Sequence, residues 1–392
     1  MADQEATPPP QVGPLQLFKP LYRVDEVLSE IRDCLEIGWT GSGYKTLEFE
    51  EEWKRYTGLP HAHFVNSATS ALHLAVRALG LSRGWLLQDE VITTPMTFVS
   101  TNHALMYEGL KPVFADVDDY LCLDPDSVER HITDKTRAVM FVGLGGGTGQ
   151  LERIVDICRK HSLALILDAA HMAGTRLRGQ DPGHLADATC YSFQAVKNLP
   201  TADSGAVCFI DPEMDAVARK LSWLGIDKDT YSRSEGGAYA WQYSVDHVGY
   251  KYHGNSIMAA MAKVALRYLD DDNMHRRAIK SVYASELTSK GFTVVPTPGD
   301  CESSTHLIQV LVENRSQVIQ ALQLESVFPG VHYRTNTDYP MYAYGRGSCP
   351  NAEHLSDRIL SLPNHLQVTQ DEAVRISKIV TQSGVPAEAT SQ

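Results

Sequence analysis

Short apolar runs alternate with amphipathic stretches along most of the chain. Runs rich in β-branched and other apolar residues predict buried strands at His63–Asn66 (HFVN), Glu90–Thr93 (EVIT), Pro112–Ala115 (PVFA), Arg137–Val142 (RAVMFV) and Leu163–Leu167 (LALIL). The intervening segments have helical spacing, as in residues 69–79. Repeated units of this kind predict an α/β fold with a mostly parallel sheet covered by helices on both faces.

The pattern changes near residue 255. A long helix is expected at Ile257–Leu269, followed by mixed helices and strands such as THLIQVLV from Thr305. We therefore expect a large domain over residues 14–250 and a smaller α/β C-terminal domain over residues 251–383, with the long helix as a hinge. The segment before about residue 48 should pack on the small domain. Residues 1–13 and 384–392 lack periodic apolar residues and are predicted to be mobile tails.

Composition narrows the class of protein. The 392 residues suggest two domains, and 43% hydrophobic with 21% charged residues is ordinary for a globular protein. A net charge of −13 and the lack of a basic run argue against a nucleic-acid partner. The seven cysteines form no CxxC pair, and no signal peptide or apolar run long enough for a membrane span is apparent. We expect a cytoplasmic protein without a membrane partner.

Three segments that follow apolar runs carry candidate chemistry, because ligands of parallel sheets bind beyond the carboxyl ends of the strands. Ser67–Leu72 (SATSAL) opens a helix after HFVN, Asp168 ends LALIL, and Lys197 follows ATCYSF in QAVKN. Each signal is weak alone. Ser and Thr commonly cap helices, an acid commonly ends a strand in a turn, and a lone lysine is usually solvated.

Taken together, the three segments match one cofactor. A hydroxyl-rich helix N-terminus suits a phosphate, and a strand-end carboxylate can keep a pyridine nitrogen protonated. A lysine amine can condense with an aldehyde. Phosphate, ring nitrogen and aldehyde are the three binding groups of pyridoxal 5'-phosphate (PLP), so the sequence predicts a PLP site.

Longer segments carry a family resemblance. They are NSATSALHLAVRALGL, DEVITTPMTFVSTNHALMYEGLKPVFADVD, LILDAAHMAG, CYSFQAVKNLPTADSGAV, VGYKYHGNSIMAAMA and GVHYRTNTDYPMY. Together they resemble the DegT/DnrJ/EryC1/StrS family of sugar aminotransferases, which have the type I fold of PLP-dependent transferases. The likeness runs in order from about Lys19 to about Val380.

The resemblance implies roles for residues around the cofactor ring. Lys197 would carry the cofactor as a Schiff base, and Asp168 would pair with the pyridinium nitrogen. His171 falls where the family places a side chain beside the ring hydroxyl. Phe98 falls where an aromatic ring stacks on the cofactor. Relatives that dehydrate sugars have histidine at the position of Lys197, so the lysine favours transamination.

The resemblance also implies how the phosphate is held. Thr69, Ser192 and the N–H groups of Ala68 and Thr69 would bind it. Lys251 matches a position from which the neighbouring subunit reaches the same phosphate, which implies a homodimer with shared active sites. Many members have asparagine there.

Substrate identity is less constrained. The resemblance implies an amino donor such as L-glutamate and a keto-sugar acceptor, nucleotide-linked or else a cyclitol ketone, contacted by Tyr333 and Arg334. The loop Gly143–Gln150 (GLGGGTGQ) replaces the usual histidine-containing turn, and Leu224 stands where many relatives have histidine.

Other readings of the residues are weaker. A nucleotide-binding Rossmann unit could be built from the glycine loop and Asp168, but Thr148 occupies the third glycine position of the fingerprint. A non-catalytic binding module would not need both Lys197 and Asp168. His61 and His63 could share a strand face, but no neighbouring cluster completes a metal site, so no metal is expected.

Overall fold

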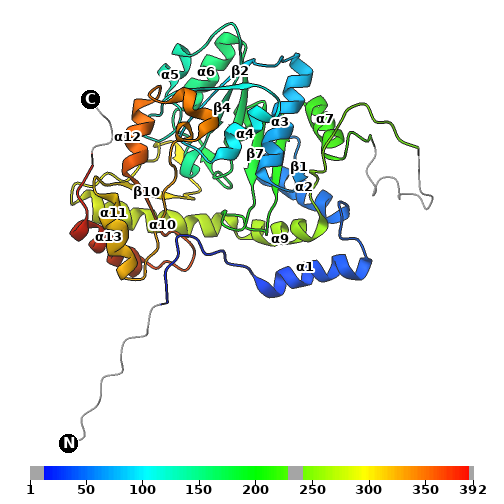
Figure 1. The fold of residues 1–392 in the computed structure, drawn as a ribbon. Helices are drawn as coiled ribbons and strands as arrows, with labels where there is room; N and C mark the ends of the chain where they lie inside the picture. Colours follow the sequence, from blue (N-terminus) through cyan, green and yellow to red (C-terminus); the bar gives the residue numbers. More distant parts are fainter. Residues whose placement is uncertain (1–12, 228–241, 388–392) are drawn as a thin grey trace, which may run out of the picture.

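A seven-stranded sheet between two layers of helices forms the main body of the chain (Figure 1). The computed structural model describes residues 13–227 and 242–387. The strand order is β1-β8-β7-β5-β4-β2-β3. The strands are β1 (His63–Val65), β2 (Glu90–Thr93), β3 (Lys111–Phe114), β4 (Thr136–Val142), β5 (Ala164–Asp168), β7 (Ala188–Ser192) and β8 (Gly205–Phe209).

The expected mostly parallel sheet is confirmed. Within it β8 runs antiparallel to both of its neighbours, β1 and β7, and the other strands are parallel to one another. The five strands predicted from apolar runs correspond to β1 to β5, with end points that differ by no more than one residue. Outside this sheet, β6 (Arg176–Leu177) pairs with β9 (Cys301–Glu302), and β10 (Ile308–Leu311) pairs with β11 (Ile359–Leu362).

Helices cover both faces of the sheet because successive strand residues point in opposite directions. In β4, Ala138 and Met140 join a core with α3, α4 and α7, whereas Val139 and Phe141 join a core with α2, α6 and α9. The helices are α1 (Val24–Ile37), α2 (Tyr44–Thr57), α3 (Ala68–Arg83), α4 (Val99–Tyr107), α5 (Pro125–Arg130), α6 (Leu151–His161), α7 (Pro212–Ser222), α9 (Ser256–Arg267), α10 (Leu269–Thr288), α11 (Arg315–Leu324), α12 (Pro350–Arg358) and α13 (Gln370–Ser383).

A third core lies around β10 and β11, where α10, α11 and α13 pack together. The predicted long helix is α9, which shares its core with the large sheet, and α10 follows it almost directly. At the N-terminal end, α1 packs on α9, and Leu15 pairs with Val327 in the third core. The division of the chain near residue 250 stays a prediction.

The chain ends need one correction. Residues 384–392 were expected to form a mobile tail, but Pro386 forms a β-bridge with Val312, and Ala387 is buried in the core beside α12. A single buried alanine gives no periodic apolar pattern in the sequence, so the packing of this segment could not be predicted from that pattern. Residues 1–12 and 388–392 lie outside the described residues. Among the helices that the structure describes, none is long and apolar enough to cross a membrane.

Candidate active site

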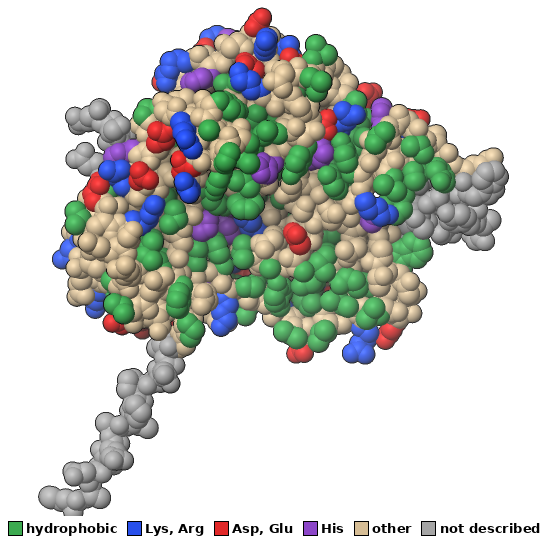
Figure 2. Space-filling view, viewed as in Figure 1, with side chains coloured by type: hydrophobic (Ala, Val, Ile, Leu, Met, Phe, Trp, Pro, Cys, Tyr) green, Lys and Arg blue, Asp and Glu red, His purple; other side chains and the backbone are tan. Residues whose placement is uncertain are grey.

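A cavity of about 410 Å³ opens where the carboxyl ends of β4, β5 and β7 meet the N-terminus of α3. Figure 2 shows a hollow at the middle of one face, with hydrophobic and histidine side chains gathered around it. All of the expected cofactor residues except Lys251 line the cavity. The complete lining is Phe18, Ser67, Ala68, Thr69, Thr97, Phe98, Ser100, Thr101, Val142, Asp168, Ala170, His171, Ser192, Gln194, Val196, Lys197, Asp203, His306, His332 and Tyr333.

Lys197 lies in the turn after β7, where its N–H donates to the carbonyl of Gln194 at 2.8 Å. Burial lowers the pKa of its amine to about 8, against an opposing effect of the Asp168 carboxylate. Among the described residues, no carboxylate oxygen lies within 4.0 Å of this amine. With a pKa of about 8, a fraction of the Lys197 amine is uncharged near neutral pH, and the uncharged form is the one that attacks an aldehyde.

Asp168 ends β5 inside the cavity and is only 4% exposed. Its carboxylate accepts hydrogen bonds from the hydroxyl of Thr101 at 2.7 Å and from the N–H of Ala170 at 3.1 Å. Burial raises the pKa of Asp168, while these two bonds and the charge of Lys197 oppose the rise. A buried carboxylate with fixed donors is suited to pairing with a cationic ring nitrogen.

His171 follows three residues after Asp168. Its Nδ1 accepts a hydrogen bond from the N–H of Gly145 at 3.2 Å, and its Nε2 lies 3.3 Å from the hydroxyl of Tyr333. The ring of His306 lies 4.4 Å away between centroids. Burial and the nearby Lys197 hold the pKa of His171 well below its usual value, so its imidazole is neutral.

The N-terminus of α3 forms another wall of the cavity. Ser67 caps this helix by accepting from the N–H of Ser70 at 3.1 Å, which is the structural role that a serine in this position commonly has. The N–H groups of Ala68 and Thr69 belong to the first turn, where a helix has no acceptors of its own. They line the cavity beside Ser192, so this end can bind an anion.

Gly205 shows how closely the sheet approaches this helix tip. A Cβ at Gly205 would lie 2.8 Å from the amide nitrogen of Ala68 and 2.6 Å from the carbonyl oxygen of Tyr191. Only glycine lets β8 pass directly beneath the first amide of α3. The cavity thus offers an anion-binding end, a carboxylate and an amine, which fit the phosphate, the ring nitrogen and the aldehyde of PLP.

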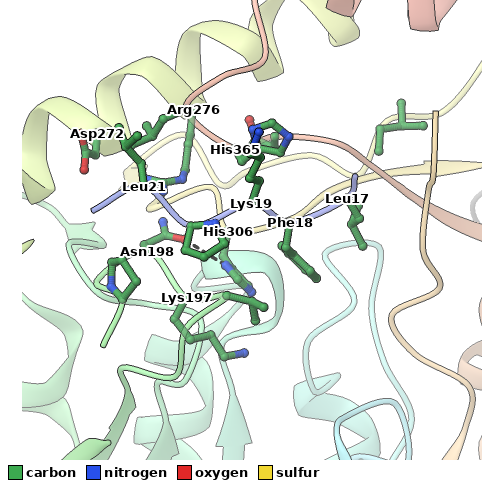
Figure 3. Close-up of a pocket in the computed structure, with 16 residues that line it drawn as sticks. Leu17, Phe18, Lys19, Leu21, Lys197, Asn198, Asp272, Arg276, His306 and His365 are labelled. Atoms are coloured by element: carbon green, nitrogen blue, oxygen red, sulfur yellow. Dashed lines mark hydrogen bonds between the residues drawn. The ribbon is translucent and has the colours of Figure 1, made fainter. Parts of the chain in front are cut away.

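Behind Lys197 the chain forms what we call the N-terminal strap (Leu15–Arg23). Its Phe18 stacks on His306 at 5.4 Å between centroids, and its Tyr22 hydroxyl donates to the carbonyl of Thr201 at 2.9 Å. Figure 3 shows the strap crossing beside Lys197 and His306, with His306 bonded to Asn198 at 2.9 Å. Phe18 also lines the cavity, so the strap supplies part of the cavity wall.

Two expected site residues do not reach the cavity. Lys251 is exposed, and its amine lies 3.2 Å from the centroid of the Trp223 ring. A role toward a second subunit stays a prediction. Arg334 points to solvent, with 66% of its side chain exposed, and pairs with Asp338 at 2.6 Å. The preceding residue, Tyr333, lines the cavity, whereas Arg334 does not.

Several lining residues were not selected from the sequence. Thr101 lies in α4, and its hydroxyl could have been suspected because PMTFVST places it three residues after Phe98. His332 directly precedes the selected Tyr333, whereas Phe18 and His306 come from distant segments with no local motif. Only the folded chain brings them to the cavity.

The glycine-rich loop does not form a nucleotide site. No residue of Gly143–Gln150 lines the cavity, and the carbonyl of Gly146 already accepts from Thr175 and Ser303. His63 is buried against Glu50 and Ser222. Among the described residues, no group of three or more His, Cys, Asp or Glu side chains could hold a metal ion.

Comparisons with known proteins agree with this geometry. The spore coat polysaccharide biosynthesis protein SpsC of Bacillus subtilis is 34% identical over 360 residues, covering 88% of this chain and 91% of SpsC. Spr1654 of Streptococcus pneumoniae, solved in a PLP form, is 27% identical with a TM-score of 0.85, covering 93% of this chain and 97% of its own. DesI, solved in the presence of its TDP-sugar product, is 28% identical with a TM-score of 0.83, covering 96% of this chain and 94% of its own.

The family model of the DegT/DnrJ/EryC1/StrS aminotransferases matches residues 22–381, which is nearly the whole described chain. This match overturns the Rossmann reading and the non-catalytic reading together. The chain belongs to the DegT/DnrJ/EryC1/StrS aminotransferase family, and it is an aminotransferase that uses PLP as its cofactor.

Proposed function

We propose that this enzyme transfers an amino group from L-glutamate to a nucleotide-linked keto-deoxysugar, giving an amino-sugar and a 2-oxo acid. The observation that carries the proposal is the cavity in which the amine of Lys197, with its lowered pKa, faces the buried carboxylate of Asp168. The likeness to SpsC and to DesI with its TDP-sugar product supports a sugar acceptor.

The residues of the cavity divide the work of the reaction. When bound, PLP supplies an aldehyde that condenses with amines and a protonated ring that withdraws electrons from the attached carbon. Asp168 would keep the ring nitrogen protonated, and Thr101 orients that carboxylate. The amine of Lys197 would take the proton from the α-carbon of the amino donor and pass it to the former aldehyde carbon of the cofactor, and it would carry out the reverse transfer when the keto-sugar is aminated, work typical of general acid–base groups.

The phosphate would be held at the tip of α3. The N–H groups of Ala68 and Thr69 and the hydroxyl of Ser192 surround that end of the cavity. The helix N-terminus adds a favourable dipole for an anion. Tyr333 and Phe98, whose rings lie 6.1 Å apart between centroids, would bound the side where the ring and the sugar enter.

A homodimer with shared active sites is part of the proposal. Lys251 is exposed on the surface, and the two segments that bridge at Trp223–Lys251 and Ile226–Val245 also carry exposed apolar side chains. These are Leu224, Tyr243, Val245 and Val248, the last exposed by 87%. Apolar side chains concentrated beside an exposed amine are expected at a subunit interface. There Lys251 would reach the phosphate end of the partner's cavity. The seven cysteines form no disulfide, which supports a reducing compartment such as the cytoplasm.

The decisive experiment maps the lysine. The purified protein should absorb in the visible range, and borohydride reduction followed by peptide mapping should place the label on Lys197. The Lys197→Ala variant should fold, lose the label and lose about 10² to 10⁴ or more in transamination rate. Labelling at another lysine, or full activity in this variant, would overturn the assignment.

A panel of acceptors then tests the substrate class. Nucleotide-linked keto-deoxysugars and free cyclitol ketones are compared with L-glutamate as donor. We expect turnover only with the nucleotide-linked compounds. Preferential turnover of a cyclitol ketone would contradict the proposed acceptor while leaving the transamination chemistry intact.

A further inference from the structure

The glycine-rich loop after β4 (Gly143–Gln150) does not form a nucleotide site, yet most of its residues are buried beside the active site. Its Gly145 has φ +66°, a left-handed conformation that favours glycine. In this conformation the N–H of Gly145 points at Nδ1 of His171, 3.2 Å away. Among the described residues of the loop, only Gly145 forms a hydrogen bond to the imidazole ring of His171.

The loop can approach His171 because side chains are absent from it. A Cβ at Gly143 would lie 2.0 Å from the sulfur of Met172, and a Cβ at Gly146 would lie 2.1 Å from the Oγ of Ser304. The carbonyl of Gly146 is fixed by hydrogen bonds from Thr175 at 2.8 Å and Ser303 at 2.9 Å. The loop is therefore held rigidly against the segment that carries His171.

The direction of the hydrogen bond from Gly145 determines which ring nitrogen of His171 carries the proton. A backbone N–H can only donate, so Nδ1 of His171 must be the acceptor, and a doubly protonated ring has no acceptor nitrogen. In the neutral ring the proton is then on Nε2. That nitrogen lies 3.3 Å from the hydroxyl of Tyr333, at the cavity.

We propose that Gly145 is a positioning residue that holds His171 as the neutral, Nε2-protonated tautomer, so that His171 presents a fixed N–H donor to an oxygen of the bound cofactor or substrate. The glycine-rich loop thus serves the active site through His171 rather than by binding a ligand itself. The groups that face His171 are Lys197, His306 and Tyr333, together with Asp168 and His332 on the cavity wall.

This inference rests on the proposed function in one respect, namely the cofactor or substrate oxygen that accepts the hydrogen bond from His171. The tautomer itself is a property of the protein, and it can be measured in the full-length chain before and after PLP is added. A failure of the tautomer assignment and a failure of the PLP site therefore give different results.

The test compares two glycine-to-alanine variants of the same loop. Gly145→Ala places a side chain at a positive φ and should displace the N–H from His171. Gly147→Ala is the matched control, because Gly147 has φ −85° and its Cβ would meet nothing closer than 3.7 Å. Both variants are labelled with ¹⁵N-histidine, and the His171 signals are assigned by their loss in His171→Gln.

In the wild-type chain and in Gly147→Ala, long-range ¹H–¹⁵N spectra should show His171 protonated on Nε2 with no titration between about pH 5.5 and 8.5, because its pKa lies well below the usual value near 6.5. Gly145→Ala should lower the Nε2-to-Nδ1 tautomer ratio by about fivefold or more, the loss of one ordinary hydrogen bond. A wild-type His171 that titrates in this range or carries its proton on Nδ1 overturns the proposal. An unchanged Nε2-to-Nδ1 tautomer ratio in Gly145→Ala also overturns the proposal.

Addition of PLP tests the tautomer of His171 separately from its role toward the cofactor. In the loaded protein, Gly145→Ala should shift the pH midpoint of the visible absorbance band or weaken PLP binding by about fivefold, whereas Gly147→Ala should not. If the tautomer behaves as expected but neither quantity moves, the donor does not face the cofactor, and that part of the proposal fails. If the wild-type chain binds no PLP at all, the proposed function fails and the tautomer result stands by itself.

Discussion

The hydrogen bond from Thr101 to Asp168 allows a quantitative test of how the cavity works. The Thr101 side chain is 1% exposed and its hydroxyl donates to the carboxylate at 2.7 Å. Thr101→Val keeps the shape of the side chain and removes the donor. A buried hydrogen bond to a charged group contributes about 1.5–3 kcal/mol. Its loss should raise the pKa of Asp168 further, because the charged form of the carboxyl loses a donor.

A higher pKa weakens the carboxylate as a partner for the protonated ring. The rate constant of the half-reaction with L-glutamate should therefore fall by about 10- to 100-fold, since 1.36 kcal/mol corresponds to a factor of ten. The folded-state pKa of Asp168 is already raised by burial, so the deficit should be greatest at low pH, where more of the variant's carboxyl is protonated, and should shrink as the pH rises. Rapid-mixing absorbance between pH 6 and 9 measures it.

Thr93→Val is the matched control. Thr93 is also fully buried, and its hydroxyl donates to the side-chain oxygen of Asn102 at 2.9 Å, away from Asp168. Both variants should lose comparable thermal stability, but Thr93→Val should keep the wild-type rate within about twofold. If Thr101→Val also kept the wild-type rate at every pH, the carboxylate would not depend on this donor, and the reasoning would be refuted.

Three further predictions concern other residues. PLP uptake by the cofactor-free protein should accelerate as pH rises through about 8, because deprotonation of Lys197 frees the attacking amine; a midpoint near the ordinary lysine value of 10.5 would contradict the assigned pKa. Lys251→Ala and Lys197→Ala should each be inactive alone but regain activity when mixed as dimers, since one site then has both lysines, and no recovery would argue against shared sites. Arg334→Ala should change kcat and KM by less than about twofold in steady-state assays because Arg334 lies outside the cavity; a tenfold rise in KM would show that it contacts the substrate.

Much of the fold was predictable because most strands of the sheet are buried on both sides. A buried strand such as Leu163–Leu167 has no polar alternation, and its apolar run is visible in the sequence. Strand ends then indicate where ligands bind, so Asp168 could be found as the first polar residue beyond one such run and Lys197 a few residues beyond another. The antiparallel direction of β8 was not predictable, because its run GAVCFI is equally apolar in either direction.

The rest of the site depends on contacts between distant segments. Phe18 and His306 meet across almost 300 residues of sequence, and neither has a neighbouring motif that indicates the other. The glycine-rich loop shows the opposite case, in which a local pattern is clear but its cause is distant. Gly143 and Gly146 are required by Met172 and Ser304, not by a ligand.

The strap at the start of the chain has a consequence for biosynthesis. Leu15 hydrogen-bonds with Ser326 and Phe328, Tyr22 with Thr201, and Arg23 with Asp272. A ribosome makes the strap before any of these partners, and it reaches Ser326 and Phe328 only after more than three hundred further residues. Because folding during translation starts from the N-terminal side, the strap must wait while the sheet assembles. The part of the cavity wall that Phe18 supplies is therefore completed only after Ser326 and Phe328 have been made, and nascent chains should not capture PLP before that point.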